Sequence, residues 1–392
     1  MYTAILAFLC LPLAMASPCQ GRDPYKTAIY LTTNAEQNSV VALPIGRNGL
    51  LGNGTSIATG GRGASGLLAS NNQPSAPDSL FSQSALTVSG KVVLKYLFAV
   101  NAGSNSLSMF LIDQQDSTKL TPVQQPLSLP GEFPVTVAAS QRKNLVCVGF
   151  SGAKAGISCA KFSAHGIEAM DQLRPIELGQ TTPPHGPLNT VSQVFFAGDE
   201  KTLYSTIKGD PMVNNTGYFA SFPVQDGKVS NEGVRSSPNG TAVLFGSVII
   251  PGTNDVFVTD ASFGAAILDV TKDGKAVAAH RGPIAGQMAT CWATLNQRTG
   301  TGFVTDAVVN RLVEISLADA SVQSSIDLSA NGDPGLLDLV SHGKFVYALS
   351  AGNGTTEAAI VVVDAVSKKQ VQHQSLAYLG AGKSSAGLAI NY

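Results

Sequence analysis

The chain has 392 residues and a formal net charge of −1, and only 13% of its residues are charged. This composition excludes strong electrostatic attraction to nucleic acid or to anionic lipid. Hydrophobic residues make up 44% of the chain, which is enough for a large core and argues against extensive disorder. The length allows either two domains or one large all-β domain.

The first 16 residues have the features of a secretory signal peptide. An apolar run over residues 4–14 leads into Ala14-Met15-Ala16, an A-x-A cleavage pattern, so the mature chain is expected to begin at Ser17. The run is too short to cross a bilayer. A buried N-terminal segment is the alternative, since no basic residue precedes the run. We expect a secreted, extracellular protein without membrane insertion, which could be associated with the cell wall.

Sequons and cysteines fit the secretory route. Four N-x-[ST] sequons lie in Gly- or Asn-containing stretches that indicate exposed loops: Asn53, Asn214, Asn239 and Asn353. Without the signal peptide four cysteines remain, an even number suited to an oxidising compartment: Cys19, Cys147, Cys159 and Cys291.

Seven segments share one pattern, in which a β-rich run, a break of Asn, Gly, Ser or Asp, and a second β-rich run follow one another. They begin at Ala28, Tyr96, Asn144, Thr202, Asp255, Thr301 and Phe345. Each pattern predicts a β-hairpin. The starts lie roughly 45–70 residues apart, which is the period of a propeller blade.

A four-stranded blade needs two further strands beside each hairpin. Short apolar runs upstream of the hairpins predict inner strands, and they begin at Pro134, Val191, Phe245, Ala289 and Leu336. More polar segments downstream, beginning at Ser321 and Lys369, predict outer strands.

The two ends of the chain predict how the ring closes. The first hairpin has no upstream strand, and residues 386–392 (AGLAINY) have no hairpin after them. The C-terminal segment is therefore expected to be the inner strand of the first blade, which leaves no open edge. The prediction is an all-β protein with a single seven-bladed propeller over residues 17–392. A pair of β-sandwiches is the alternative, but the one candidate linker, residues 53–84, fits a loop insertion between the first two hairpins.

Five residues are candidates for a site at the mouth of the propeller channel. His185 and Lys208 are hard to explain as turn residues and are the candidate catalytic residues. Three others, Glu132, Gln287 and Asp333, precede predicted inner strands and are the candidate ligand-binding residues. Asn and Asp at strand ends also suit a purely turn-forming role.

No metal or cofactor is predicted. Acidic residues occur singly at strand ends rather than as a converging cluster. The G-x-G-x-x-G match at residues 61–66 lacks a βαβ context, and residues 380–384 lack the first glycine and the helix of a phosphate-binding loop.

One disulfide follows from the hairpin register. Cys147 and Cys159 flank a turn with its midpoint at Ala153, so an antiparallel hairpin centred there places the two cysteines opposite each other. Two buried free thiols are the alternative. A second bridge between Cys19 and Cys291 follows only by elimination.

Two segments, YLTTNAEQNSV and YLFAVNAGSNSL, resemble Y-V-T-N propeller repeats. The chain after Ser17 is similar to lactonase-type seven-bladed propellers, and specifically to secreted fungal proteins called 3-carboxymuconate cyclase-like. The resemblance implies a channel mouth where a histidine, two arginines and a glutamate open or close a lactone. His185 fits the histidine, but Phe245, Asp260 and Asp306 stand near the positions expected for the other three.

Loss of both cations and of the glutamate weakens the catalytic interpretation. We therefore expect a secreted glycoprotein, monomeric, that binds a protein or glycan as a cell-surface antigen, adhesin or effector. The alternative is a lactone hydrolase or carboxymuconate-type cycloisomerase with an altered pocket, in which His185 is the base and Lys208 binds the oxyanion or carboxylate of a small lactone.

Overall fold

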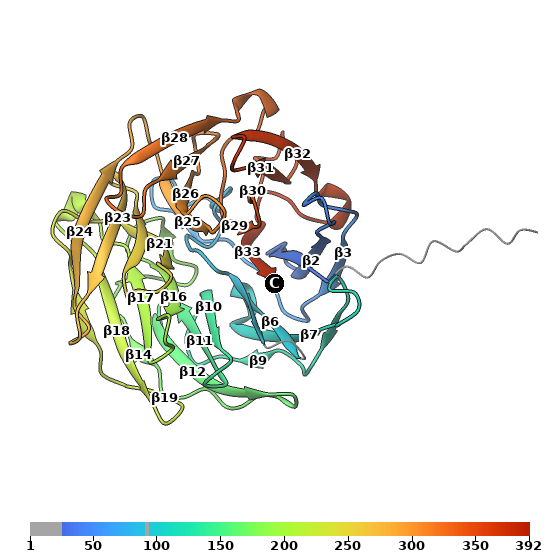
Figure 1. Cartoon of the computed structure of the whole chain (residues 1–392). Coiled ribbons are helices and arrows are strands. Elements are labelled where there is room, and N and C mark those ends of the chain that lie inside the picture. The colour runs from blue at the N-terminus through green and yellow to red at the C-terminus, as the bar shows by residue number, and fades with distance from the viewer. Residues whose placement is uncertain (1–25, 91–93) are drawn as a thin grey trace, which may run out of the picture.

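The computed structural model describes residues 26–90 and 94–392, and in it seven antiparallel sheets surround a central axis (Figure 1). The predicted seven-bladed propeller is confirmed, and each predicted hairpin forms the second and third strands of one blade. The predicted signal peptide and Cys19 lie outside the described residues.

The first four blades, each given from its inner to its outer strand, have these bounds. Blade 1 consists of β33 (Ala386–Asn391), β1 (Ala28–Thr32), β2 (Ser39–Pro44) and β3 (Thr55–Ala58). Blade 2 consists of β5 (Leu86–Gly90), β6 (Lys95–Asn101), β7 (Ser106–Ile112), β8 (Leu120–Pro122) and β9 (Leu127–Ser128). Blade 3 consists of β10 (Pro134–Ser140), β11 (Leu145–Phe150), β12 (Gly156–Ser163), β13 (Gly166–Ile167) and β14 (Arg174–Pro175). Blade 4 consists of β16 (Val191–Phe196), β17 (Thr202–Ile207), β18 (Tyr218–Gln225), β19 (Lys228–Val229) and β20 (Val234–Ser236).

The remaining blades have four strands each. Blade 5 consists of β21 (Leu244–Ile249), β22 (Val256–Asp260), β23 (Gly264–Val270) and β24 (Ala276–Pro283). Blade 6 consists of β25 (Thr290–Asn296), β26 (Thr301–Asp306), β27 (Arg311–Ile315) and β28 (Val322–Asp327). Blade 7 consists of β29 (Leu339–His342), β30 (Phe345–Ser350), β31 (Ala359–Asp364) and β32 (Lys369–Ser375). Short 3-10 helices are η1 (Ala102–Ser104), η2 (Pro211–Val213), η3 (Ser329–Asn331) and η4 (Ala377–Leu379). In the described part of the chain no helix has the length and apolar character needed to span a membrane.

The C-terminal strand closes the ring as predicted. β33 pairs with β1 in antiparallel register, with Ile390 opposite Ile29 and Ala389 opposite Tyr30. In Figure 1 the red end of the chain lies against the blue strands of blade 1. Closure gives every inner strand a neighbour on both sides.

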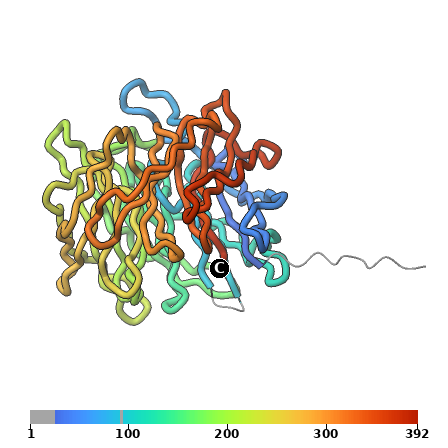
Figure 2. The backbone as a smooth tube through the Cα atoms, turned by 45° about the horizontal axis from the view of Figure 1, so that its top comes forward, coloured from blue at the N-terminus to red at the C-terminus, as the bar shows by residue number. Residues whose placement is uncertain are grey.

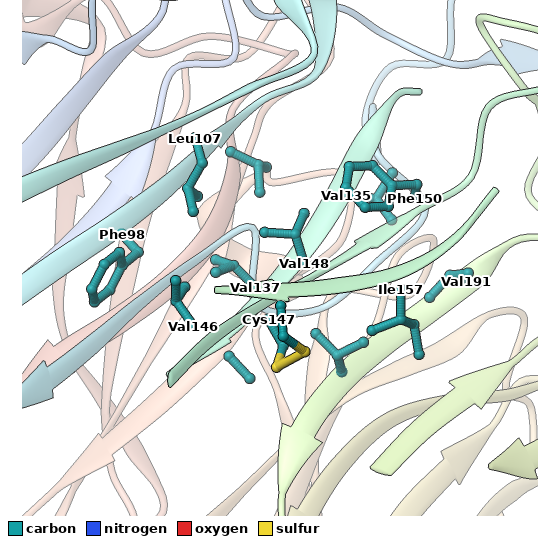
Figure 3. Packing of buried hydrophobic residues seen from close by; sticks show 14 of the residues in the cluster. Phe98, Leu107, Val135, Val137, Val146, Cys147, Val148, Phe150, Ile157 and Val191 are labelled. Carbon is teal, nitrogen blue, oxygen red and sulfur yellow. A yellow bond between two sulfur atoms is a disulfide. The ribbon is translucent and has the colours of Figure 1, made fainter. Parts of the chain in front are cut away.

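The hydrophobic core lies between neighbouring blades. Figure 3 shows part of it, where Phe98 and Leu107 of blade 2 face Val137 and Val148 of blade 3. These side chains are no more than 1% exposed. Each such side chain stabilises the fold by roughly 1.5–3 kcal/mol relative to an exposed position. The blades are therefore held together by apolar packing, while hydrogen bonds hold the strands within each blade.

The predicted disulfide is present in blade 3. Cys147 of β11 lies opposite Cys159 of β12, and the two are bonded, with Cα atoms 4.0 Å apart. Cys291 is buried and makes no disulfide with a described residue. Its pairing with Cys19 stays a prediction, because Cys19 lies outside the described residues.

Reduction of the Cys147–Cys159 bond is expected to lower the free energy of unfolding by no more than about 3 kcal/mol, because a loop this short loses little entropy when it is closed. The two cysteines are 12 positions apart. Denaturant titrations with and without reductant measure the change, after peptide mapping under non-reducing conditions. A mapped Cys147–Cys291 peptide would contradict both the bond and the hairpin register.

Candidate functional site at the channel mouth

A loop of the chain itself fills the channel mouth, the end of the channel where the inner strands begin. Residues 59–85 connect β3 to β5, and we call residues 78–84 the plug. Residues 79–83 of the plug are no more than 6% exposed. Figure 2 shows the light blue part of this connection rising on one face, while the C-terminal end of β33 lies towards the other. Of the predicted insertion 53–84, residues 55–58 form β3, residues 53–54 lie just before that strand, and residues 59–84 belong to this connection.

The plug hydrogen-bonds to backbone groups of the inner strands. Ser82 Oγ donates to the Val135 carbonyl of blade 3 at 2.7 Å. Gln83 Nε2 donates to the Ala293 carbonyl of blade 6 at 2.9 Å, and the Ala293 N–H donates back to Gln83 Oε1 at 3.1 Å. The Gln83 N–H donates to the Ser192 carbonyl of blade 4 at 2.9 Å. Inner strands have unpaired backbone groups along the channel, and the plug satisfies several of them.

Side chains at the mouth complete this attachment. Trp292 Nε1 donates to the Ser82 carbonyl at 3.0 Å, and Asn34 Nδ2 donates to Ser79 Oγ at 2.9 Å. In blade 5 a Cβ on Gly246 would lie 2.1 Å from Gln83 Oε1. Strand β21 therefore approaches the plug so closely that a larger residue at this position would clash with it. The plug is thus an integral part of the fold.

Lys208 lies beneath the plug rather than at an open mouth. It follows β17 and is 2% exposed, and its Nζ donates to the Phe81 carbonyl of the plug. The same atom lies 4.1 Å from the centre of the Phe245 ring. Burial lowers the pKa of Lys208 to about 8, although the attraction of Asp78 opposes this shift. Burial likewise raises the pKa of Asp78 to about 6, and Lys208 opposes that shift.

His185 lies at the half-buried rim of the mouth. It belongs to β15 (His185–Gly186), which pairs in parallel with β4 (Leu67–Leu68) of the connecting loop. Its Nδ1 is 3.0 Å from Thr181 Oγ1. The neighbouring Thr182 donates from Oγ1 to Glu132 Oε2 at 2.6 Å, so the two predicted residues lie on the same stretch of rim without contact.

Gln287 and Asp333 each make local contacts. Gln287 Nε2 donates to the Ala261 carbonyl at 2.9 Å. Asp333 Oδ2 is 3.0 Å from Nε2 of His373 on the outer strand β32. Within residues 26–90 and 94–392, no hydrogen bond or ion pair joins any two of the five predicted site residues. Their assignment to a common site stays a prediction.

The strand-end aspartates have the turn-forming role that the sequence allowed. Asp306 accepts the N–H groups of Met288 at 2.7 Å and Val308 at 3.0 Å. Asp260 accepts the Ala242 N–H at 2.7 Å in the same way. No group of three or more potential metal ligands is found among the described residues.

Sequence reasoning missed one residue that holds the plug. Asp338 is 1% exposed and accepts N–H groups from Ser84 of the plug at 3.2 Å and Leu388 of β33 at 3.0 Å. It therefore links the plug to the strand that closes the ring. Burial raises the pKa of Asp338 to about 7 despite these hydrogen bonds. Its apolar neighbours in LLDLV, a predicted inner strand, were a signal that this carboxyl would be buried.

Asp338 is expected to make the protein less stable as the pH rises from about 4 to about 7. The folded state holds this proton up to a pKa of about 7, whereas the unfolded state releases it near 3.8. The folded state thus binds more protons in this window, and the group contributes a loss of at most about 1.4 kcal/mol per pH unit. The measurement is the free energy of unfolding against pH for the native protein and for Asp338→Asn. If the free energy of unfolding changed equally with pH in the two proteins, Asp338 would not be the group responsible.

Comparisons with known proteins extend over nearly the whole chain. The periplasmic gluconolactonase of Pseudomonas aeruginosa superposes with a TM-score of 0.63 at 12% identity, over 93% of this chain and 99% of that one. The two proteins have the same propeller fold. A putative 6-phosphogluconolactonase from Bacteroides fragilis gives a TM-score of 0.59 at 10% identity, over 95% and 99% of the two chains.

A second putative 6-phosphogluconolactonase, from Bacteroides uniformis, gives a TM-score of 0.53 at 16% identity, over 72% of this chain and 82% of that one. No protein-family model matches the sequence, and no curated protein matches it. At these identities the likeness to lactonase-type propellers establishes the fold alone.

Proposed function

We propose that this chain is a secreted glycoprotein that works by binding rather than by catalysis on a lactonase-type propeller. The main observation behind the proposal is that the plug fills the channel mouth. A substrate bound at the mouth needs Lys208 exposed, but the plug covers this side chain, which is 2% exposed and already donates one hydrogen bond to the Phe81 carbonyl. Phe245 is 1% exposed and packs edge-on against Trp292, with ring centres 4.9 Å apart.

The other candidate groups that the structure describes at the mouth already have partners. Asp260 and Asp306 use their carboxylates on backbone N–H groups. His185 is the one predicted catalytic side chain at the rim. Glu132, on the same stretch of rim, accepts a hydrogen bond from Thr182 and lies 3.7 Å from Lys154 Nζ. A base without an anion-binding partner provides little of the charge stabilisation that lactone chemistry requires.

Surface features support the secretory part of the proposal. All four sequon asparagines are exposed, as a glycan acceptor must be: Asn53, Asn214, Asn239 and Asn353. The Cys147–Cys159 disulfide suits an oxidising compartment. The partner would be a protein or a glycan outside the cell.

A lactone panel tests the proposal with the purified full-length mature protein. Neutral sugar lactones, phosphorylated sugar lactones and muconolactones are incubated with the protein and with His185→Ala, and ring opening is followed by proton release. We expect no turnover above the uncatalysed rate in either protein. Turnover that is lost in His185→Ala would overturn the binding role and establish the lactonase alternative.

A further inference from the structure

The channel has a second opening, at the end where the inner strands finish. A cavity of about 340 Å³ lies there against blades 2 to 5. Six of its lining residues carry the argument: Ser84, Thr87, Ala139, Gln193, Phe196 and Glu200. Ser84 belongs both to the plug and to the cavity wall, so the plug closes the inner end. The result is a blind pocket that opens on the face opposite the mouth.

The polar groups of this pocket are fixed in place and include donors and acceptors. Gln193 is 4% exposed, and its Oε1 accepts the Ser247 N–H at 2.6 Å while its Nε2 donates to Ser84 Oγ at 3.2 Å. Within the described part of the chain, neither the second proton of the Gln193 amide nor the hydroxyl proton of Ser84 has an acceptor, so both can donate to a ligand. Thr87 adds a hydroxyl group that can donate or accept.

Among the described residues, Glu200 is the one charged residue that lines the pocket, and it is paired with an arginine outside the lining. Its Oε2 accepts hydrogen bonds from Ser140 Oγ and from the Arg142 N–H, and its Oε1 is 3.8 Å from Arg142 Nε. The nearby Asp199 is paired with Lys201 at 3.9 Å. The arginine offsets part of the charge of the carboxylate, and the Oε1 atom can still accept a hydroxyl proton.

We propose that this blind pocket binds a neutral, hydroxylated molecule of the size of a single sugar residue. The mixed donors and acceptors match hydroxyl groups, and Ala139 and Phe196 offer an apolar wall for the carbon face of a ring. The volume is at the lower end of the range for ligand pockets, which suits one ring rather than an extended chain. This inference rests on the proposed binding role and locates its site away from the mouth.

Saturation-transfer NMR on the intact mature protein tests the inference. The probes are four free monosaccharides, glucose, galactose, mannose and N-acetylglucosamine, and soluble oligosaccharides that end in each of them. Ala139→Phe should fill the pocket and weaken binding at least tenfold, and Thr87→Val should weaken it about threefold. Ala318→Phe is the matched control, because Ala318 is exposed on a turn of blade 6, and it should bind as the native protein does.

The probes separate two sources of the same chemistry. Binding of a free monosaccharide supports a soluble ligand, and binding of the oligosaccharides alone supports the end of a glycan. No binding to any probe, or binding unchanged in folded Ala139→Phe, would overturn the pocket assignment. That failure leaves the proposed binding role intact, because only lactone turnover contradicts that role.

Discussion

A protein without residues 386–392 is expected not to fold. Residues 386–391 form β33, which pairs with β1, and all six of them are buried. Their removal exposes the edge of β1 to solvent and removes the Leu388 N–H from the buried Asp338 carboxyl. It also takes Leu388 and Ile390 out of the core between blades 7 and 1. Far-ultraviolet circular dichroism and secretion yield measure the loss.

A permuted protein controls for the loss of the strand's residues. Asn391 lies opposite Ala28, so the end of β33 is next to the start of β1. The segment 386–392 can therefore precede Lys26 through a short linker and form the same pair as a hairpin. We expect the permuted protein to fold with a melting temperature close to that of the native chain. A truncated protein with an unchanged melting temperature would show that ring closure is not needed.

The architecture was predictable because hairpins are encoded locally. The stretches around Asp260 and Asp306 each have a β-rich run, a polar break and a second run, and these became β22–β23 and β26–β27. The opposition of Cys147 and Cys159 followed from the midpoint of one turn, and the structure has that register. Closure by residues 386–392 followed from counting strands. The first blade lacked an inner strand, and the C-terminal segment was a strand without a hairpin, so the two belong together.

The state of the channel mouth was not predictable in the same way. Residues 53–84 are rich in Gly, Ser, Pro and Asn, which is typical of exposed loops. The burial of the plug within this stretch depends on backbone groups such as the carbonyls of Val135 and Ser192, which become available only when the ring has formed. Lys208 stood out in the sequence because a lysine is unusual in a turn. Its hydrogen bond to the Phe81 carbonyl gives Lys208 a structural role, whereas the sequence had suggested a catalytic one.

Replacement of Lys208 by alanine is expected to lower the free energy of unfolding by about 2–4 kcal/mol, the usual cost of removing a buried side chain together with its hydrogen bond. The variant loses the hydrogen bond to the Phe81 carbonyl, leaves Asp78 without its opposing charge and empties the space beside the Phe245 ring. Denaturant titration measures the change. Lys275→Ala is the matched control, because the Lys275 side chain is 63% exposed, and its effect should stay within about 0.5 kcal/mol.

A second variant separates the charge pair from the lost packing. Lys208→Met keeps the length of the side chain without its charge, and Asp78→Asn removes the opposing charge while its Oδ1 can still accept the Phe81 N–H. The combined variant should recover much of the stability that Lys208→Met loses alone, because neither partner is then left charged and unpaired. A side chain that serves only a bound substrate would give a different result. In that case Lys208→Ala would unfold at the same denaturant concentration as the native protein, and the plug would not depend on this lysine.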